Sequence, residues 1–270
     1  MIKIKTNWGY CLSFRNNDEK IQLFDGSNKK AKDINVLDLI EICPDNPCNC
    51  SESSPKKTIT KDDAFLLGIL YGCYNSQTKK KIEISPQNET LFNWLLDKFG
   101  KLGIPVKIED RGIRVIIVIE DTSCLSNFLS ENNLSISNII MRQYPKCVIE
   151  LKICKYFVAG VFESTAYVDN KIGSKKIVAI LEKEKFVDTT QWILYLYGVY
   201  SQKVETQLPG VYTLTIPPYF MREFKKEIYQ IISDYSKKLY VDSNDLKSNQ
   251  ALDNFKNGIL YDSVRAIEIA

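Results

Sequence analysis

A short apolar segment with two small residues four positions apart occurs twice in this chain, and it restricts the possible folds more than any other feature. The first copy carries Gly68 and Gly72, and the second carries Gly160 and Ser164. In an α-helix, residues four apart lie on the same face, so each copy forms a helix with one side almost free of side chains. The repeat therefore predicts two helices that pack closely together at these four positions.

Composition narrows the class of protein. Hydrophobic residues make up 44% and charged residues 26% of the 270 positions, as in soluble globular domains. No apolar run reaches the roughly 20 residues of a membrane span, and the first residues alternate lysine with isoleucine instead of forming the apolar core of a signal peptide. We expect an intracellular protein, cytoplasmic or nuclear, with no membrane partner, and a monomer whose internal repeat creates its symmetry.

The chain contains no histidine. This absence excludes catalysis by Ser-His-Asp or Cys-His systems and any metal site with imidazole ligands. The net charge of +3 is too small by itself to indicate a nucleic-acid partner, so the clustering of the basic residues decides that question.

Apolar periodicity predicts the order of the elements. Each motif helix is followed by a strand, an amphipathic helix, a hairpin and a further helix, with a weaker strand at 74–77 and a long last helix at 217–238. Residues 258–269 form a strand that we expect to return to the N-terminal strands. The resulting division is a β-rich N-terminal part at 1–42, a linker at 43–59, a first unit at 60–145, a second unit at 146–240 and a C-terminal return at 241–270.

Three closely spaced cysteines, Cys43, Cys48 and Cys50, lie in the linker. Thiolates at short spacing bind metal ions, but a structural zinc site needs a fourth ligand and commonly a Cys-x-x-Cys knuckle, and neither is evident. Two interpretations stay open. The segment is a metal site or, as the simpler alternative, a loop of reduced thiols as found in intracellular proteins.

The doubled helix, with elements in matching order after each copy, resembles the LAGLIDADG homing endonucleases over residues 60–240. The two chain ends resemble a Hint (intein splicing) module at Thr6–Tyr10, Phe24–Gly26 and Tyr261–Ile267. The resemblance implies an α+β fold with two LAGLIDADG αββαββα units related by a pseudo-two-fold axis. It also implies antiparallel saddle sheets and a small β-rich Hint-like remnant formed by the two chain ends.

In that family, the last turn of each motif helix carries an acid that holds a divalent metal ion at the scissile phosphates. The matching positions here are Cys73 and Thr165, and neither side chain is a carboxylate. Glu163 and Asp169 are the nearby acids that could substitute. The resemblance therefore implies a degenerate active site without a cofactor, or with Mg²⁺ if nuclease activity survives.

The same resemblance bears on splicing. Inteins use a nucleophilic first residue, an assisting histidine and a terminal His-Asn pair, whereas this sequence begins with Met1, ends with Ala270 and contains no histidine. We expect that the polypeptide does not self-splice. Ligated product from an in-frame fusion between two reporter domains would contradict this expectation.

The resemblance also implies double-stranded DNA as the partner, contacted by the antiparallel sheets in the major groove. Basic residues fall on strands and turns of both units where these sheets are expected. Each of them alone is equally well explained by a solvated face, and together they favour a basic saddle. The candidates are Lys79, Lys80, Lys81, Lys107, Arg111, Arg114, Lys171, Lys175, Lys176 and Lys203.

Three interpretations of function compete. The first is an intein-derived LAGLIDADG protein that binds duplex DNA without cutting it, the second an active site-specific endonuclease with an unorthodox metal site, and the third a domesticated interaction protein without either activity. Specific double-strand cleavage would identify the second. Salt-sensitive duplex binding separates the first from the third.

Overall fold

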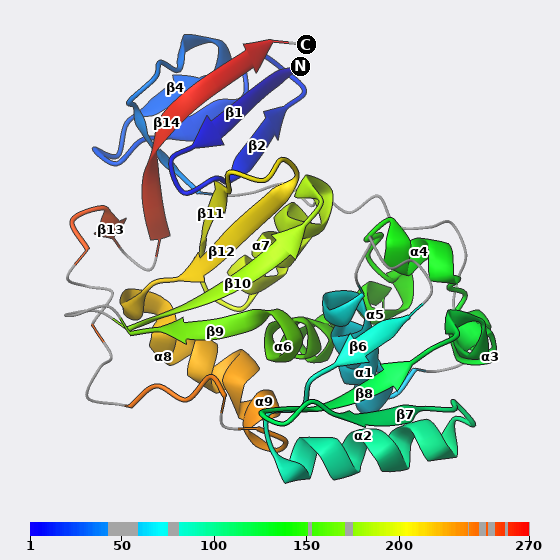
Figure 1. The fold of residues 1–270 in the computed structure, drawn as a ribbon. Coiled ribbons are helices and arrows are strands. Elements are labelled where there is room, and N and C mark those ends of the chain that lie inside the picture. The colour runs from blue at the N-terminus through cyan, green and yellow to red at the C-terminus, as the bar shows by residue number, and fades with distance from the viewer. Residues whose placement is uncertain are drawn as a thin grey trace.

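The structure is a computed structural model that describes residues 1–42, 59–74, 81–150, 153–170, 175–236, 238–242, 247, 252–256 and 259–269. Over these residues the chain combines helices with antiparallel strands (Figure 1), which confirms the predicted α+β class. Two helices that carry the repeated motif lie at the centre. Each unit contributes a sheet beside them, and a further sheet unites the two chain ends.

The two motif helices are α1 (Lys61–Cys73) and α6 (Cys154–Thr165), and they pack against each other as predicted. α1 begins with a capping box, in which the Thr60 hydroxyl accepts from the Asp63 N–H and the Asp63 carboxylate accepts from the Thr60 N–H. Residues 64–71 are all buried. A helix that is apolar all round is a central helix rather than a surface one.

The seam between α1 and α6 is built on Gly68 and Gly160. A methyl group added at Gly68 would strike the Phe157 carbonyl oxygen and lie 2.9 Å from the Gly160 Cα. A methyl group added at Gly160 would strike the Phe65 carbonyl oxygen and lie 3.0 Å from the Gly68 Cα. The contacts are reciprocal, as a two-fold relation between the helices requires, and they leave no room for a side chain.

The sheet of the second unit has the strand order β11-β12-β10-β9, and every pair is antiparallel. Its elements are β9 (Ala166–Asp169), β10 (Lys176–Glu182), α7 (Glu184–Leu196), β11 (Gln202–Glu205) and β12 (Val211–Ile216). β9 follows α6 without a loop. Pairing with β10, where Ala166 lies opposite Ala179, holds this segment extended.

The sheet of the first unit has the order β6-β8-β7. Its elements are β6 (Ile82–Ile84), α2 (Glu89–Lys101), β7 (Lys107–Asp110) and β8 (Val115–Ile119). The β7–β8 hairpin is the predicted one. Of the weaker strand expected at 74–77, Tyr74 forms an isolated antiparallel bridge to Ile82, and residues 75–77 lie outside the described part of the chain.

Short helices connect the two units. They are the 3₁₀ helix η2 (Thr122–Leu125), α3 (Ser126–Glu131), α4 (Ile136–Ile140) and α5 (Lys146–Glu150). The further helix predicted after the first hairpin corresponds to η2 and α3 together. Within the described residues, none of the helices combines the length and the apolarity that crossing a membrane requires.

The long helix predicted over 217–238 ends earlier than expected and is irregular. Residues 218–233 are helical without a break, as the 3₁₀ helix η3 (Pro218–Phe220), α8 (Met221–Phe224), the π-helical turn η4 (Lys225–Tyr229) and α9 (Gln230–Ser233). The buried residues Phe220, Phe224, Ile228 and Ile232 recur every four positions, which is longer than the 3.6-residue period of an α-helix. The wider π turn keeps this row facing the core.

The two chain ends form one sheet of order β13-β14-β1-β2, in which β5 also pairs with β14. The strands of this sheet are β1 (Ile2–Thr6), β2 (Cys11–Phe14), β5 (Leu39–Glu41), β13 (Phe255–Lys256) and β14 (Ile259–Ile269). Beside them, β3 (Lys20–Gln22) and β4 (Asn28–Lys30) form a separate two-stranded sheet, and the 3₁₀ helix η1 (Ala31–Asp33) follows β4. The predicted return of the last strand is confirmed, because residues 2–5 pair with 266–269. N- and C-terminus lie close together at this sheet (Figure 1).

Trp8 fastens the terminal sheet to the second unit. Its carbonyl oxygen accepts from the Lys203 N–H at 2.9 Å and from the Gln191 side-chain amide at 3.1 Å. The backbone N–H of Trp8 donates to the Asp262 carboxylate. The next residue, Gly9, has a φ of +81°, and a Cβ there would lie 2.7 Å from the Lys203 carbonyl oxygen, so only glycine fits this close approach.

Candidate functional site

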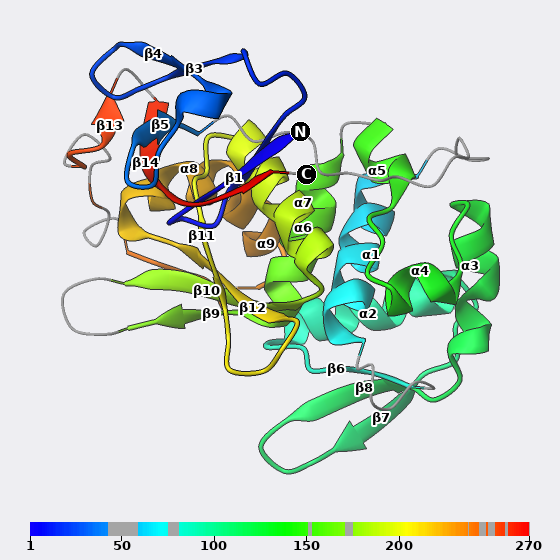
Figure 2. The same cartoon turned by 90° about the horizontal axis from the view of Figure 1, so that it is seen from above.

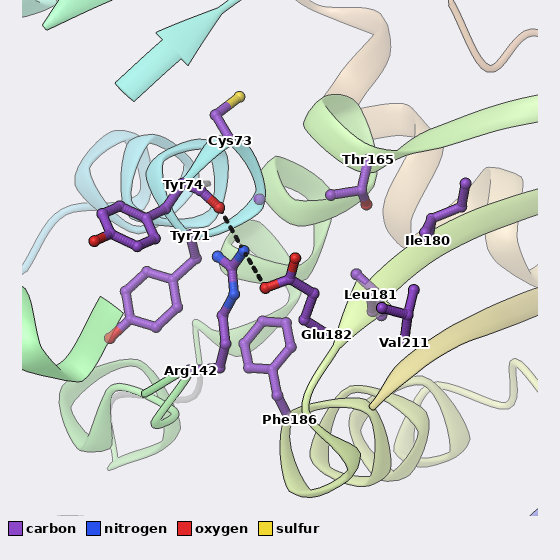
Figure 3. A pocket seen from close by; sticks show the side chains of 11 residues that line it. Tyr71, Cys73, Tyr74, Arg142, Thr165, Ile180, Leu181, Glu182, Phe186 and Val211 are labelled. Atoms are coloured by element: carbon purple, nitrogen blue, oxygen red, sulfur yellow. Dashed lines mark hydrogen bonds and ion pairs between the residues drawn. The ribbon is translucent and has the colours of Figure 1, made fainter. Parts of the chain in front are cut away.

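The C-terminal ends of the two motif helices open into a pocket of about 390 Å³ (Figure 3). Cys73 is the last residue of α1 and Thr165 is the last residue of α6. The two positions that correspond to the family's acids therefore lie at the same end of the helix pair. The pocket is lined by Tyr71, Gly72, Cys73, Tyr74, Arg142, Thr165, Ile180, Leu181, Glu182, Phe186 and Val211.

Neither Cys73 nor Thr165 supplies a negative charge to this pocket. Burial raises the pKa of the Cys73 thiol to about 12, so the thiol stays protonated at neutral pH. The Thr165 hydroxyl donates to the Val161 carbonyl oxygen at 2.7 Å, one turn back in its own helix. The helix ends thus present a neutral thiol and a hydroxyl that is already hydrogen-bonded to a backbone carbonyl oxygen.

Gly72 and Ser164 extend the helix seam up to the pocket. A methyl group added at Gly72 would strike the Ser164 hydroxyl oxygen and lie 2.9 Å from the Ser164 Cβ. The Ser164 hydroxyl donates to the carbonyl oxygens of Gly160 and Val161, at 3.0 and 2.9 Å. The structure therefore brings the small residues of both motif copies together along one seam.

Glu163 and Asp169 are not among the residues that line the pocket. The Glu163 side chain is buried, and within the described residues neither carboxylate oxygen makes a well-formed hydrogen bond, although Ser236 lies beside it. Burial raises the pKa of Glu163 to about 7, against the opposing effect of the Lys238 ammonium. Asp169, at the end of β9, pairs with Lys176 at 3.6 Å.

The pocket contains a cation that sequence reasoning missed. Arg142 lies between α4 and α5 with a left-handed φ of +52°, and its side chain is 6% exposed. Its Nη2 donates to the Tyr74 carbonyl oxygen at 2.7 Å and lies 3.5 Å from a Glu182 carboxylate oxygen (Figure 3). Within the described residues, its Nη1 has no hydrogen-bond partner. Arg142 belongs to neither motif copy, so no repeat pattern could have indicated it.

The candidate DNA contacts of the first sheet are neutralised by glutamates on the same face. Arg111 donates to the carboxylates of Glu83 and Glu109, at 3.0 and 2.7 Å. Lys81 pairs with Glu83 at 2.6 Å, and Lys107 lies 3.4 Å from both Glu109 and Glu120. These three cations therefore face three carboxylates, and the predicted basic surface is close to neutral here.

The second sheet departs further from the predicted basic saddle. Lys203 points to the helix side of β11, where it pairs with Asp188 and lies 3.4 Å from Glu184 of α7. Its side chain is 10% exposed, so its assignment to the exposed face is wrong. Lys176 stays on that face, paired with Asp169, and Lys175 precedes it. Lys79, Lys80 and Lys171 lie outside the described residues.

Arg114 lines a second, larger pocket of about 990 Å³. This pocket lies where the start of β8 approaches the junction between α6 and β9, and it shares Thr165 with the first pocket. Its walls are Ser85, Pro86, Gln87, Asn88, Glu89, Phe92, Ile113, Arg114, Val115, Thr165, Ala166, Tyr167 and Lys238. Arg114 is exposed, so it is available to an anionic partner.

A metal centre has no evident place in the part of the chain that the structure describes. There, three or more histidine, cysteine, aspartate or glutamate side chains do not gather in a group that could hold a metal ion. The described cysteines are free thiols. Cys43, Cys48 and Cys50 lie outside the described residues, so both interpretations of that segment stand.

Comparisons with known proteins add likenesses of fold. No protein-family model and no curated protein matches the chain. Among solved structures, the chain is similar to the N-terminal LAGLIDADG domain of DUF199/WhiA, with 17% identity and a TM-score of 0.44 over 74% of this chain and 91% of that one. It is also similar to I-DmoI in complex with DNA and Mn, with 14% identity and a TM-score of 0.42 over 62% of this chain and 96% of that one.

Proposed function

We propose that this protein is a LAGLIDADG-type scaffold of intein origin that binds double-stranded DNA and does not cut it. The observation that carries the proposal is a close, reciprocal helix seam whose ends bear Cys73 and Thr165. Such a seam fixes the relative position of two sheets, which a saddle over a duplex needs. Helix ends without carboxylates cannot assemble the metal ions that stabilise the attacking and leaving oxygens of a phosphodiester.

The residues at the helix ends do not fit Mg²⁺. This ion requires near-octahedral oxygen ligands, usually including a carboxylate, and a protonated thiol such as that of Cys73 is a poor substitute. Glu182 is the acid that lines the pocket, and its carboxylate pairs with Arg142. We infer that phosphodiester cleavage has been lost, and no step of it is assigned to these residues.

Both sheets lie on the same side of the helix pair (Figure 2), and we propose that a duplex binds there. Arg114 would contact a phosphate directly. Lys81, Lys107, Arg111 and Lys176 would exchange a carboxylate for a phosphate, which weakens each contact. Because phosphate contacts carry no sequence information, we expect modest, salt-sensitive binding with weak sequence preference.

We further propose that the sheet of the chain ends descends from a Hint module and no longer splices. Its support is a small apolar cluster that includes Ile4, Ile40, Leu260 and Val264, takes in Tyr200 and Phe220 of the second unit, and is distinct from the core around the motif helices. On this basis the proposed parts are the two Hint-like ends at 1–42 and 241–270, the linker at 43–59, and the LAGLIDADG units at 60–145 and 146–240.

A second candidate function is protein binding by the same surface. The observation in its favour is the apolar character of the outward face of the second sheet, where Tyr167, Ile180 and Val204 are each nearly half exposed. Because the cations of the first sheet are paired with carboxylates, this apolar face would also suit burial against another protein. This candidate corresponds to a domesticated interaction protein.

One experiment separates these functions. The purified chain is incubated with a plasmid library of random inserts and Mg²⁺ or Mn²⁺, and both cleavage and retention of DNA are measured. The proposal expects retained, uncut DNA at about 50 mM salt and release of the DNA as the salt concentration rises. Defined double-strand cuts would show an active endonuclease instead, and no retention at any salt concentration would favour the protein-binding candidate.

A further inference from the structure

Arg142 is buried with fewer acceptors than its guanidinium has donors, although the guanidinium also lies 6.0 Å from the centre of the Tyr74 ring. The side chain is 6% exposed, and burial lowers its pKa while Glu182 opposes this effect. A buried guanidinium normally uses its donors in paired, short hydrogen bonds. Here, among the described residues, Nη1 has no acceptor at all.

The partners of Arg142 leave it only partly neutralised. Nη2 donates to a neutral group, the Tyr74 carbonyl oxygen. The Glu182 oxygen lies 3.5 Å away, whereas a charge-assisted hydrogen bond between such groups is about 2.8 Å long. The Glu182 side chain is 37% exposed, so it can move into solvent. An anion that enters the pocket can therefore displace Glu182 without breaking a tight ion pair.

The rest of the pocket suits an anion better than a cation. Cys73 is a protonated thiol and Thr165 a neutral hydroxyl, so the helix ends present no competing carboxylate. The pocket has a volume of about 390 Å³, which is sufficient for a small anionic group. The guanidinium is the charged group that hydrogen-bonds oxyanions most directly.

We propose that Arg142 makes this pocket a phosphate-binding site, in which Glu182 swings away and the guanidinium hydrogen-bonds a phosphate group at the edge that Glu182 leaves. For a phosphate of duplex DNA this inference rests on the proposed function. The positive charge of Arg142 would then stand where a metal ion would otherwise have stood. The same chemistry would hold a free phosphate. Glu182 then acts as an internal competitor that limits affinity.

Two substitutions with opposite expected signs test the proposal. Duplex affinity and its salt dependence are measured by fluorescence anisotropy, and inorganic phosphate binding by calorimetry. Arg142→Gln should weaken duplex binding about tenfold and reduce the salt slope by about one unit, and Arg142→Lys should retain part of the affinity. Glu182→Gln should tighten binding several-fold, because it removes the competing carboxylate.

Lys226→Gln is the matched control, because Lys226 is 79% exposed on η4 and pairs with a glutamate of its own segment. It should leave phosphate binding unchanged. If Arg142→Gln does not fold, the affinity of Glu182→Gln for duplex DNA and phosphate tests the proposal. Loss of a purely structural ion pair would give no gain in this affinity. Unchanged affinity in Glu182→Gln, or wild-type affinity in folded Arg142→Gln, would overturn the proposal.

The proposed function can fail while this inference survives. If the wild-type chain does not bind duplex DNA, the titration with inorganic phosphate decides. Phosphate binding that is lost in Arg142→Gln and strengthened in Glu182→Gln would support a site for a free phosphate group. Absence of both duplex and phosphate binding would reject the site.

Discussion

Gly68→Ala tests how closely the two motif helices pack. In Gly68→Ala, the new methyl group would strike the Phe157 carbonyl oxygen and lie 2.9 Å from the Gly160 Cα. These neighbours are backbone atoms of a packed helix, so α1 and α6 must move apart. A separation of about 1 Å forfeits up to half of each dispersion contact across the seam. Alanine gains about 1 kcal/mol in helix propensity, which does not offset this loss.

We therefore expect Gly68→Ala to lower the free energy of unfolding by about 3 kcal/mol, the upper end of overpacking costs. Gly160→Ala should cost the same amount, because its contacts are reciprocal. The double variant should cost less than the sum of the two, since one separation of the helices relieves both clashes. Urea denaturation followed by circular dichroism measures all three.

Gly100→Ala is the matched control. Gly100 lies in α2, and a Cβ built there meets no atom within 4 Å. Alanine should stabilise the protein here by about 1 kcal/mol. If Gly68→Ala behaved like Gly100→Ala, the close seam between the motif helices would be refuted.

Three further predictions follow from single contacts. The pKa of Glu163 is raised to about 7 in the folded chain. The free energy of unfolding should therefore fall by about 3 kcal/mol as the pH rises from about 4.5 to 7. Glu163→Gln should remove this fall when denaturation is measured at several pH values. Glu83→Gln should tighten duplex binding in a gel shift, because it removes the carboxylate that pairs with Lys81 and one of the two that pair with Arg111, and should change stability by under about 1 kcal/mol. Gln191→Ala should lower thermal stability by about 1–3 kcal/mol, because it removes a buried donor to the Trp8 carbonyl oxygen.

The parts of the fold that could be predicted from the sequence depend on local periodicity. Four small residues at a spacing of four indicated the helix seam, and alternation over residues 258–269 indicated a strand that needed partners. The π turn within residues 218–233 could not be predicted, because a four-residue repeat of buried side chains is compatible with both α and π turns. Periodicity alone does not distinguish them.

The surface chemistry depended on tertiary placement, which periodicity cannot supply. In β11, the apolar Val204 would be expected to point inward, yet its side chain is nearly half exposed. Its neighbour Lys203 points inward instead and pairs with Asp188 on α7. Arg142 and Glu182 meet only through the packing of distant segments. The glutamates that neutralise the first sheet likewise require the strand register.

The proposed function requires this scaffold to hold a duplex without cutting it. The most direct measurement is the salt dependence of binding to a labelled duplex in the presence of Mg²⁺, with the DNA recovered afterwards. We expect a linear fall of log affinity with log salt, with a slope of about −2 to −5 for a few phosphate contacts, and intact DNA. Salt-independent binding, no binding, or recovery of cleaved strands would contradict it.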